Sequence, residues 1–353
     1  MNVLSIGSDR SIANPHSASA QRQIAYGTRL GELDIIVFSL RKQKLSEQTL
    51  AIGVRVHPTG SHSRLFYGWD SFRIARRLPK PDVISVQDPF ETGLIGLLIA
   101  RWLRIPLHVQ VHTDFLAPAF AGLSFMNRIR VFLAGVVLRR AARVRVVSGR
   151  IKESVAKRYG LKMPITILPI FVDVERFRNA HAGDLAGRFA RFDKRILVVA
   201  RLEKEKNVAL AIESFAEVAP ENACLIIVGG GSGRHRLEKL APTNVFFEGQ
   251  QDPAPYYVLA DLVLVPSAYE GYGIVIIEAL AAGKPVLSTD VGIARDAGAI
   301  VASPETFARV LAEWFDIGQR EGKLLRYPYA SFDEYTRRYC EDIAQAAGIS
   351  PAA

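Results

Sequence analysis

The residues best suited to chemistry lie in one stretch, EGYGIVIIE, which runs from Glu270 to Glu278. The preceding strand-like run ends near Ser267, and a helix is predicted from Ile274 to Ala282, so the glycines fall at a helix amino terminus. Free backbone N–H groups and the helix dipole favour phosphate or sugar hydroxyls there, and glycine lets a ligand approach the backbone. Two glutamates at this spacing also occur on solvated helix faces, so the pattern alone leaves both interpretations open.

A second motif, VVARLEKEKNVALAIESF, places Arg201 and Lys206 between a predicted strand and a predicted helix. Arginine offers a planar donor fork and lysine a mobile point charge, a combination suited to a diphosphate. Asn207 is expected to cap the helix that follows. The alternative is a charged surface turn in which Glu203 and Glu205 neutralise the cations.

Two further motifs are weaker. The glycine-rich turn IVGGGSGRHRL follows a strand, but a GxGxxG fingerprint that starts at Gly229 needs a third glycine where Arg234 stands. A flexible turn near a nucleotide and a purely structural turn both remain open. In VQVHTDF, His112 and Asp114 end an apolar strand, where a histidine can transfer protons or serve structure alone.

These motifs need elements that hold them, and the chain supplies short aliphatic strands alternating with helical periodicity. The alternation stops near residues 175–190 and then restarts, which predicts an α/β protein with two Rossmann-like domains whose parallel sheets face each other across a cleft. We expect an amino-terminal domain at residues 1–178, a second domain at 179–330, and a carboxyl-terminal helix within 331–353 that is free to cross back to the first domain.

Composition narrows the class of protein. Hydrophobic residues make up 49% of the 353 residues, enough for two cores. The longest apolar runs are shorter than the roughly 18 residues that span a bilayer, and the first residues do not read as a signal peptide, so we expect a cytoplasmic protein. Cys224 and Cys340 lack metal-binding or disulfide spacing, and no Asp-x-Asp motif occurs, so no metal and no bound cofactor is expected.

The charge is unevenly distributed. Residues up to Arg178 contain 27 Lys and Arg against 12 Asp and Glu, a net +15, whereas the remaining residues contain 18 against 23, a net −5. The segment FMNRIRVFLAGVVLRRAARVR adds an apolar helix face, as an interfacial helix would. An anionic ligand or peripheral binding to the inner face of the membrane would explain the charge, and a solvated surface over an ordinary core is the alternative. No nucleic-acid-binding motif is present.

Taken together, the motifs resemble the family 4 glycosyltransferases, which have the GT-B fold and transfer sugars with retention of configuration. The resemblance covers most of the chain and is strongest from Arg195 to Gly292, where VARLEKEKN resembles the donor-diphosphate element and EGYGIVIIEALAAGKPVLSTDVG the paired-glutamate element. HVQVHTDF resembles the histidine segment of the first domain.

The resemblance implies a role for each residue. Arg201 and Lys206 would bind the donor diphosphate, and Glu278 the nucleotide ribose. Glu270 would contact the transferred sugar, and His112 would lie near the reacting centre. Other expected donor contacts are Gly271, Tyr272, Gly273 and Ile274, with Gly7, Asp114 and Gln250 as secondary candidates.

The expected reaction moves a sugar from a nucleoside-diphosphate donor to a glycan or lipid-linked acceptor without a metal. The alternatives are a sugar-nucleotide epimerase, a phosphorylase-like enzyme and a non-catalytic nucleotide-sugar binding protein. The chain departs from the family pattern at the loop after the first strand, which has only Gly7, at Ile170 and Phe171 in PIFVD, and at Ile293 after TDVG. The first two departures put the donor-facing wall of the first domain in doubt.

Overall fold

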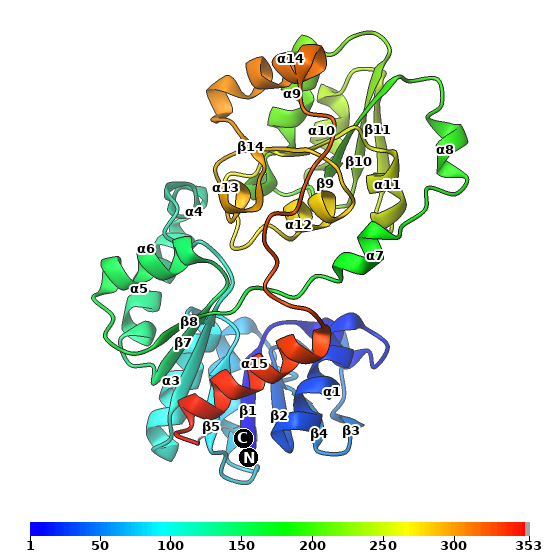
Figure 1. Ribbon diagram of the computed structural model, residues 1–353. Coiled ribbons are helices and arrows are strands. Elements are labelled where there is room, and N and C mark those ends of the chain that lie inside the picture. The colour runs from blue at the N-terminus through cyan, green and yellow to red at the C-terminus, as the bar shows by residue number, and fades with distance from the viewer. Residues whose placement is uncertain (350–353) are drawn as a thin grey trace. The chain divides into compact units, whose positions relative to one another are not determined.

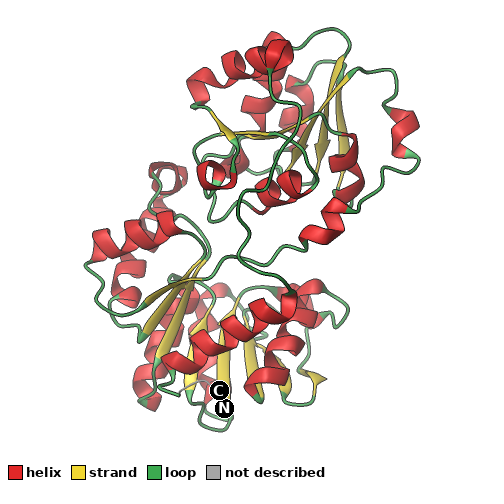
Figure 2. Ribbon diagram, in the orientation of Figure 1, coloured by secondary structure: helices red, strands yellow, loops and turns green. Residues whose placement is uncertain are grey.

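The computed structural model describes residues 1–349, which form two compact units, each built on one sheet (Figure 1). The first unit contains Met1–Leu116, Ser124–Pro169 and the described residues from Tyr329 onward. The second contains Ala117–Leu123 and Ile170–Pro328. Within each unit helices flank the strands (Figure 2), the arrangement that buries both faces of a parallel sheet. The predicted α/β class with two parallel-sheet domains is confirmed.

The sheet of the first unit has eight strands in the order β3-β4-β2-β1-β5-β6-β7-β8. Its strands are β1 (Asn2–Gly7), β2 (Glu32–Val37), β3 (Gln48–Ala51), β4 (Val54–Pro58), β5 (Val83–Val86), β6 (Leu107–Val111), β7 (Arg143–Val146) and β8 (Ile165–Ile167). All pairs are parallel except β3 with β4, an edge hairpin that the sequence motifs did not predict. The central strands are buried on both faces, and β5, β6 and β7 place polar side chains, among them Ser85, Gln110 and Arg145, between their aliphatic residues.

The helices of the first unit include α1, which begins after the Ser17 cap, and α15, which begins after the Ser331 cap. Figure 1 shows α15 crossing one face of this sheet, where it packs on β5, β6, β7 and α1. The helical segments are η1 (Arg10–Ala13), α1 (Ala18–Leu30), η2 (Arg41–Gln43), η3 (Arg64–Phe66), α2 (Tyr67–Ala75), α3 (Glu91–Leu103), α5 (Phe125–Leu138), α6 (Gly149–Tyr159) and α15 (Phe332–Ala346).

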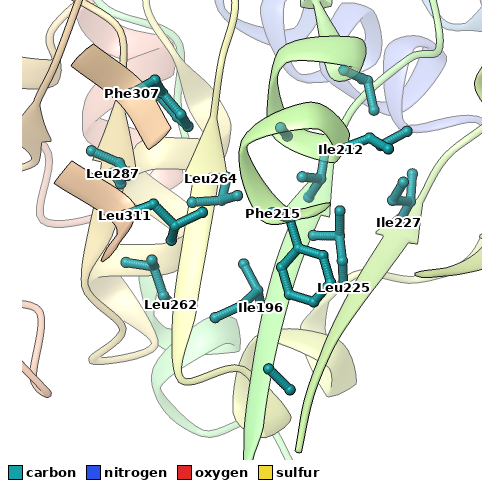
Figure 3. Close-up of a cluster of buried hydrophobic side chains, with 14 of the residues drawn as sticks. Ile196, Ile212, Phe215, Leu225, Ile227, Leu262, Leu264, Leu287, Phe307 and Leu311 are labelled. Atoms are coloured by element: carbon teal, nitrogen blue, oxygen red, sulfur yellow. The ribbon is translucent and has the colours of Figure 1, made fainter. Parts of the chain in front are cut away.

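The sheet of the second unit is parallel throughout, in the order β11-β10-β9-β12-β13-β14. Its strands are β9 (Lys194–Val199), β10 (Ala223–Val228), β11 (Val245–Gly249), β12 (Leu262–Val265), β13 (Val286–Ser288) and β14 (Ile300–Val301). Figure 3 shows the core on one face of this sheet, where Phe215 packs among strand residues such as Ile196 and Leu225. This core fixes the strand ends from which the candidate site is built.

The helices of the second unit include α4, whose residues follow directly after Leu116 of the first unit. They are α4 (Pro118–Leu123), α7 (Val174–Arg178), α8 (Leu185–Arg188), η4 (Lys204–Lys206), α9 (Val208–Val218), α10 (Arg234–Leu240), α11 (Ala254–Leu259), α12 (Ile274–Ala281), α13 (Ala294–Ala297), η5 (Pro304–Thr306) and α14 (Phe307–Ile317). Across residues 1–349, none of the helices has both the length and the apolar character that a membrane crossing requires.

Candidate active site

The loop between β12 and α12 carries Glu270, which contacts a second predicted site residue, Lys206 of η4. The Glu270 Oε1 atom accepts hydrogen bonds from Lys206 Nζ at 2.6 Å and from Ser267 Oγ at 2.8 Å. The Lys206 and Glu270 side chains are 19% and 16% exposed, so most of their surface is shielded from water while a part of each stays accessible. A partly desolvated ion pair of this kind can exchange one partner for a ligand of the same charge.

The amino terminus of α12 is shaped by two glycines with positive φ. Gly273 adopts φ 94° immediately before the helix, and Gly292 adopts φ 52°. A Cβ atom on Gly292 would lie 2.3 Å from the Tyr272 carbonyl oxygen, which also accepts a hydrogen bond from the Ile293 N–H. Gly292 therefore lets its own turn pack against the loop that carries Glu270, and α12 begins four residues after that glutamate.

Arg201 is connected to this loop indirectly, through hydrogen bonds made by Glu205. Its guanidinium is 70% exposed and pairs with Glu205 Oε1 at 2.8 Å. The Glu205 carbonyl in turn accepts from the Ala268 N–H at 2.8 Å, which ties η4 to the loop after β12. The expected cap at Asn207 is wrong: the residue stands before α9 with φ 47°, and its side chain makes no capping hydrogen bond.

Glu278 lies on α12, where Tyr257 of α11 donates a hydrogen bond to its Oε2 atom at 2.8 Å. Burial raises the pKa of Glu278, and the hydrogen bond from Tyr257 acts in the opposite direction. Burial and the neighbouring carboxylate raise the pKa of Tyr257 well above its ordinary value, so this hydroxyl remains a donor. A carboxylate held in this way keeps oxygen lone pairs for a second donor such as a sugar hydroxyl.

The glycine-rich turn after β10 has a clear packing explanation. A Cβ atom on Gly229, which adopts φ 141°, would lie 1.9 Å from the Ala200 carbonyl oxygen, and one on Gly231 would lie 2.7 Å from the Leu202 backbone. The turn is also tied to the end of β9, because the Leu202 N–H donates to the Gly230 carbonyl at 2.9 Å. These glycines thus permit close backbone packing beside Arg201.

His112 belongs to the first unit, just past the end of β6. Its Nε2 atom lies 3.2 Å from Gln110 Oε1. Burial, reinforced chiefly by the charge of Arg145, lowers the pKa of His112 to about 3, so the imidazole is neutral at physiological pH. Asp114 is buried, and Gly7 ends β1 where a Cβ atom would lie 2.3 Å from Gln87 Oε1.

Gln250 follows β11 and is exposed. Next to it, Phe247, Glu248, Gln251, Asp252 and Tyr256 contribute to the lining of a hollow of about 440 Å³. Glu248 is oriented there by hydrogen bonds from Tyr256 at 2.9 Å and from Arg188. Gln250 thus lies beside this hollow, and its role stays a prediction.

The structure therefore brings Lys206, Glu270 and the Gly273 helix start together, and links Arg201 to them through Glu205. Sequence reasoning missed Ser267 and Tyr257, although the first ends the predicted strand directly before the loop. It also missed Phe120 of α4, whose ring packs edge-on against Tyr269 at 5.5 Å between centroids.

Comparisons with known proteins agree with this architecture. Residues 26–176 match the model described as Glycosyltransferase Family 4, and residues 193–316 match that described as Glycosyl transferases group 1. A GDP-mannose-dependent alpha-mannosyltransferase of Mycobacterium tuberculosis is 31% identical over 259 residues, 69% of this chain and 66% of that protein. An alpha-monoglucosyldiacylglycerol synthase of Streptococcus pneumoniae is 26% identical over 227 residues, 59% of this chain and 51% of the synthase. The chain thus spans about half to two thirds of these relatives.

Solved structures show the same fold. Sucrose-phosphate synthase from Thermosynechococcus elongatus superposes with a TM-score of 0.74 at 17% identity, over 99% of this chain and 94% of that one. Anabaena Alr3699/HepE, solved in complex with UDP and glucose, gives 0.69 at 18% identity, over 99% and 97%. The fold and the matched segments are those of the GT-B class. Within it, the chain belongs to glycosyltransferase family 4.

Proposed function

We propose that this chain transfers a sugar from a nucleoside-diphosphate donor to a glycan or lipid-linked acceptor, with retention of configuration and without a metal. The observation that carries the proposal is the Lys206–Glu270 pair beside the glycine-lined start of α12, within the segment that matches the family model. A donor site must recognise two kinds of group in a nucleotide sugar. Lys206 and the start of α12 offer partners to the diphosphate, and Glu270 offers one to the sugar hydroxyls.

In this proposal Lys206 and Arg201 attract the donor diphosphate, and the N–H groups at the start of α12 donate hydrogen bonds to its oxygens. The contact to Gly271, Tyr272 and Ile274 is through their backbone. Glu270 accepts from hydroxyls of the transferred sugar, while Glu278 accepts from the ribose. As the bond from the anomeric carbon to the diphosphate oxygen breaks, its electrons pass to the diphosphate, and the fixed cations and helix dipole stabilise that charge.

His112 is proposed to accept a hydrogen bond near the reacting sugar, because its low pKa keeps the imidazole neutral. The acceptor oxygen bonds to the same face of the anomeric carbon that the diphosphate leaves, and the acceptor's proton leaves with the diphosphate. Gly7, Asp114 and Gln250 remain secondary candidates in the proposal.

The test is a donor panel followed by one substitution. Thermal-shift screening with UDP, GDP and ADP identifies the base, because a preferred ligand stabilises the fold in proportion to its occupancy. Glu270→Gln is expected to lower transfer from the matching nucleotide sugar by about 100-fold or more without weakening nucleotide binding. Glu217→Gln, on the exposed surface of α9, is the matched control. Unchanged transfer by Glu270→Gln would refute the assigned role.

The reaction products separate this function from its alternatives. A transferase consumes donor, modifies an acceptor and keeps its rate in EDTA. An epimerase interconverts nucleotide sugars, a phosphorylase consumes inorganic phosphate, and a non-catalytic binding protein leaves the donor intact.

We also propose that the first unit binds an anionic membrane surface, where a lipid-linked acceptor would be found. Its helix α3 packs against α2 and α5, and these three helices expose large apolar side chains, including Trp69 at 72% and Phe132 at 71% exposure. Trp102 of α3 is half-exposed and packs on Phe72 at 4.6 Å between ring centroids. Exposed arginines accompany them, namely Arg73, Arg76, Arg101, Arg104, Arg128 and Arg140. Apolar and cationic side chains on one set of helices are typical of interfacial binding.

Tryptophan fluorescence tests this surface, because Trp314 is buried and the other two tryptophans lie on it. Phosphatidylglycerol vesicles are expected to shift the emission to the blue at low salt, and phosphatidylcholine vesicles are not. Phe132→Ser should weaken vesicle binding, whereas Ile317→Ser, an exposed apolar position of the second unit, should not. No binding to phosphatidylglycerol at low salt would remove this part of the proposal.

A further inference from the structure

A network of buried polar side chains in the first unit ends at His112. In each of its hydrogen bonds the chemistry of the partners decides which atom donates and which accepts. Gln110 of β6 sits at its centre. The Gln110 Oε1 atom lies 2.9 Å from Arg145 Nη1 and 3.2 Å from His112 Nε2, while Gln110 Nε2 lies 3.1 Å from Ser85 Oγ and 2.9 Å from Tyr339 Oη. All four contacts of the amide are thus accounted for within one unit.

Arg145 decides which way the Gln110 amide points. A guanidinium donates hydrogen bonds and accepts none, so the atom facing Arg145 Nη1 must be the amide oxygen. Arg145 itself is fixed, because it is fully buried, donates to the Leu168 carbonyl and the Tyr335 hydroxyl at 3.1 Å, and stacks on the Tyr339 ring at 4.9 Å. The opposite orientation of Gln110 would set the amide N–H groups against a buried cation.

The other end of the network gives the same direction. The carboxylate of Asp342 accepts from His108 Nε2 at 2.9 Å, so His108 Nδ1 accepts from Ser85 Oγ at 2.9 Å when this imidazole is neutral. Ser85 Oγ is then free to accept from Gln110 Nε2. A carboxylate that only accepts and a guanidinium that only donates therefore impose one polarity on the chain of bonds between them.

We propose that Arg145, through Gln110, holds His112 in the tautomer that carries its proton on Nε2, which leaves Nδ1 as the single acceptor the imidazole offers to a ligand. Because the Gln110 oxygen can only accept, His112 Nε2 must donate to it. Arg145 and Gln110 are thus positioning residues for His112. The consequence for catalysis rests on the proposed function: a hydroxyl of the donor sugar would donate to Nδ1, and a ligand that itself offers only acceptors would not be bound there.

Nuclear magnetic resonance of the full chain labelled with ¹⁵N-histidine tests the tautomer without substrate. The His112 signals are identified by their loss in His112→Gln, and Nδ1 is expected to show the shift of a lone-pair nitrogen and Nε2 that of a protonated one. A spectrum with the proton on Nδ1, or with both tautomers populated, would overturn the proposal. The tautomer is thus read from the spectrum of the unaltered chain, and a variant serves only to assign the His112 signals.

Two substitutions and a control separate positioning from general structure. Gln110→Glu keeps an acceptor for both Arg145 and His112 and is expected to retain the Nε2–H tautomer. Gln110→Met removes that acceptor, and it should produce a mixture of tautomers and lower kcat about tenfold with little change in nucleotide affinity, the effect of one lost hydrogen bond. Ser85→Ala leaves the Arg145–Gln110 contact in place and should keep the tautomer. If the tautomer is as stated but no sugar is transferred, the proposed function fails and the positioning inference stands.

Discussion

Removing the hydroxyl of Tyr257 tests whether its hydrogen bond keeps the buried Glu278 side chain ionised and able to bind a ligand. Tyr257 is fully buried, and its Oη atom donates to Glu278 Oε2 at 2.8 Å. Tyr257→Phe deletes this donor while keeping the ring, so Glu278 loses a hydrogen bond in surroundings that already raise its pKa. We expect both the pKa of Glu278 and the affinity for a nucleoside diphosphate to respond.

The magnitude follows from the geometry. A hydrogen bond to a charged group contributes about 1.5–3 kcal/mol, and one unit of pKa corresponds to about 1.4 kcal/mol. Loss of the Tyr257 donor should therefore raise the pKa of Glu278 further by about one to two units. A ribose hydroxyl donates a stronger hydrogen bond to the carboxylate than to the carboxylic acid, so binding weakens as the pH falls through this pKa. In the variant this weakening should begin at a pH higher by the same one to two units.

Calorimetric titration with the nucleoside diphosphate selected by the thermal-shift panel, at a series of pH values, measures this displacement. Tyr256→Phe is the matched control, because the neighbouring tyrosine donates to Glu248 at 2.9 Å and not to Glu278. The control should keep the pH dependence of the unaltered chain. If Tyr257→Phe also keeps it, Glu278 does not bind the nucleotide in the way proposed.

Three further predictions concern stability and charge. Gly229→Ala should destabilise the second unit by about 2 kcal/mol or more, because the residue adopts φ 141° and its Cβ would lie 1.9 Å from a carbonyl oxygen. Gly230→Ala is the control, since no atom lies within 4 Å of its Cβ, and it should change the midpoint of urea unfolding little. Burial acts to raise the pKa of Asp342, but hydrogen bonds from His108, Thr166 and Arg143 together act against it, and the pKa is lowered from 3.8 to about 2. Because its pKa is depressed, the ionised Asp342 stabilises the first unit above about pH 4. The free energy of unfolding of this unit should fall by roughly 2 kcal/mol as the pH falls from about 4 to about 2. Unfolding followed by circular dichroism should show a smaller decrease in Asp342→Asn. Lys206→Met should lower both nucleotide affinity and the stability of the second unit, since it leaves a partly buried carboxylate without its cation, whereas Arg201→Met, at a 70% exposed side chain, should lower affinity alone in a thermal-shift titration.

Local patterns predicted the elements of the site well. The apolar run after Gly273 predicts a helix that begins at Ile274, and α12 begins there. Strand-like runs before Arg201 and Ser267 became β9 and β12, because aliphatic segments bounded by glycine and polar residues have few other ways to bury both faces. The restart of the pattern after the first sheet likewise predicted a second α/β unit.

Long-range contacts could not be predicted from the sequence patterns, because they depend on which elements become neighbours in the fold. Lys206 and Glu270 are far apart in the sequence, and their 2.6 Å contact requires β9 and β12 to be adjacent in the sheet. No sequence pattern shows that Ala117–Leu123 joins the second unit, or that Arg145, which looks like a surface charge in RVRVVSG, is completely buried. The β3–β4 hairpin was missed because its strands are short and polar.

The Lys206–Glu270 pair has a consequence for ligand selection. When Lys206 turns its charge to a phosphate at the expense of its contact to Glu270, this carboxylate retains the Ser267 hydrogen bond. A free diphosphate replaces the partner of the lysine but leaves the partly buried carboxylate without a cation, which is costly. A nucleotide sugar replaces both partners, because its diphosphate pairs with Lys206 while its hydroxyls donate to Glu270. The proposed site therefore discriminates in favour of the intact donor through the carboxylate, and the release of a nucleoside diphosphate after transfer is assisted when Lys206 and Glu270 pair again.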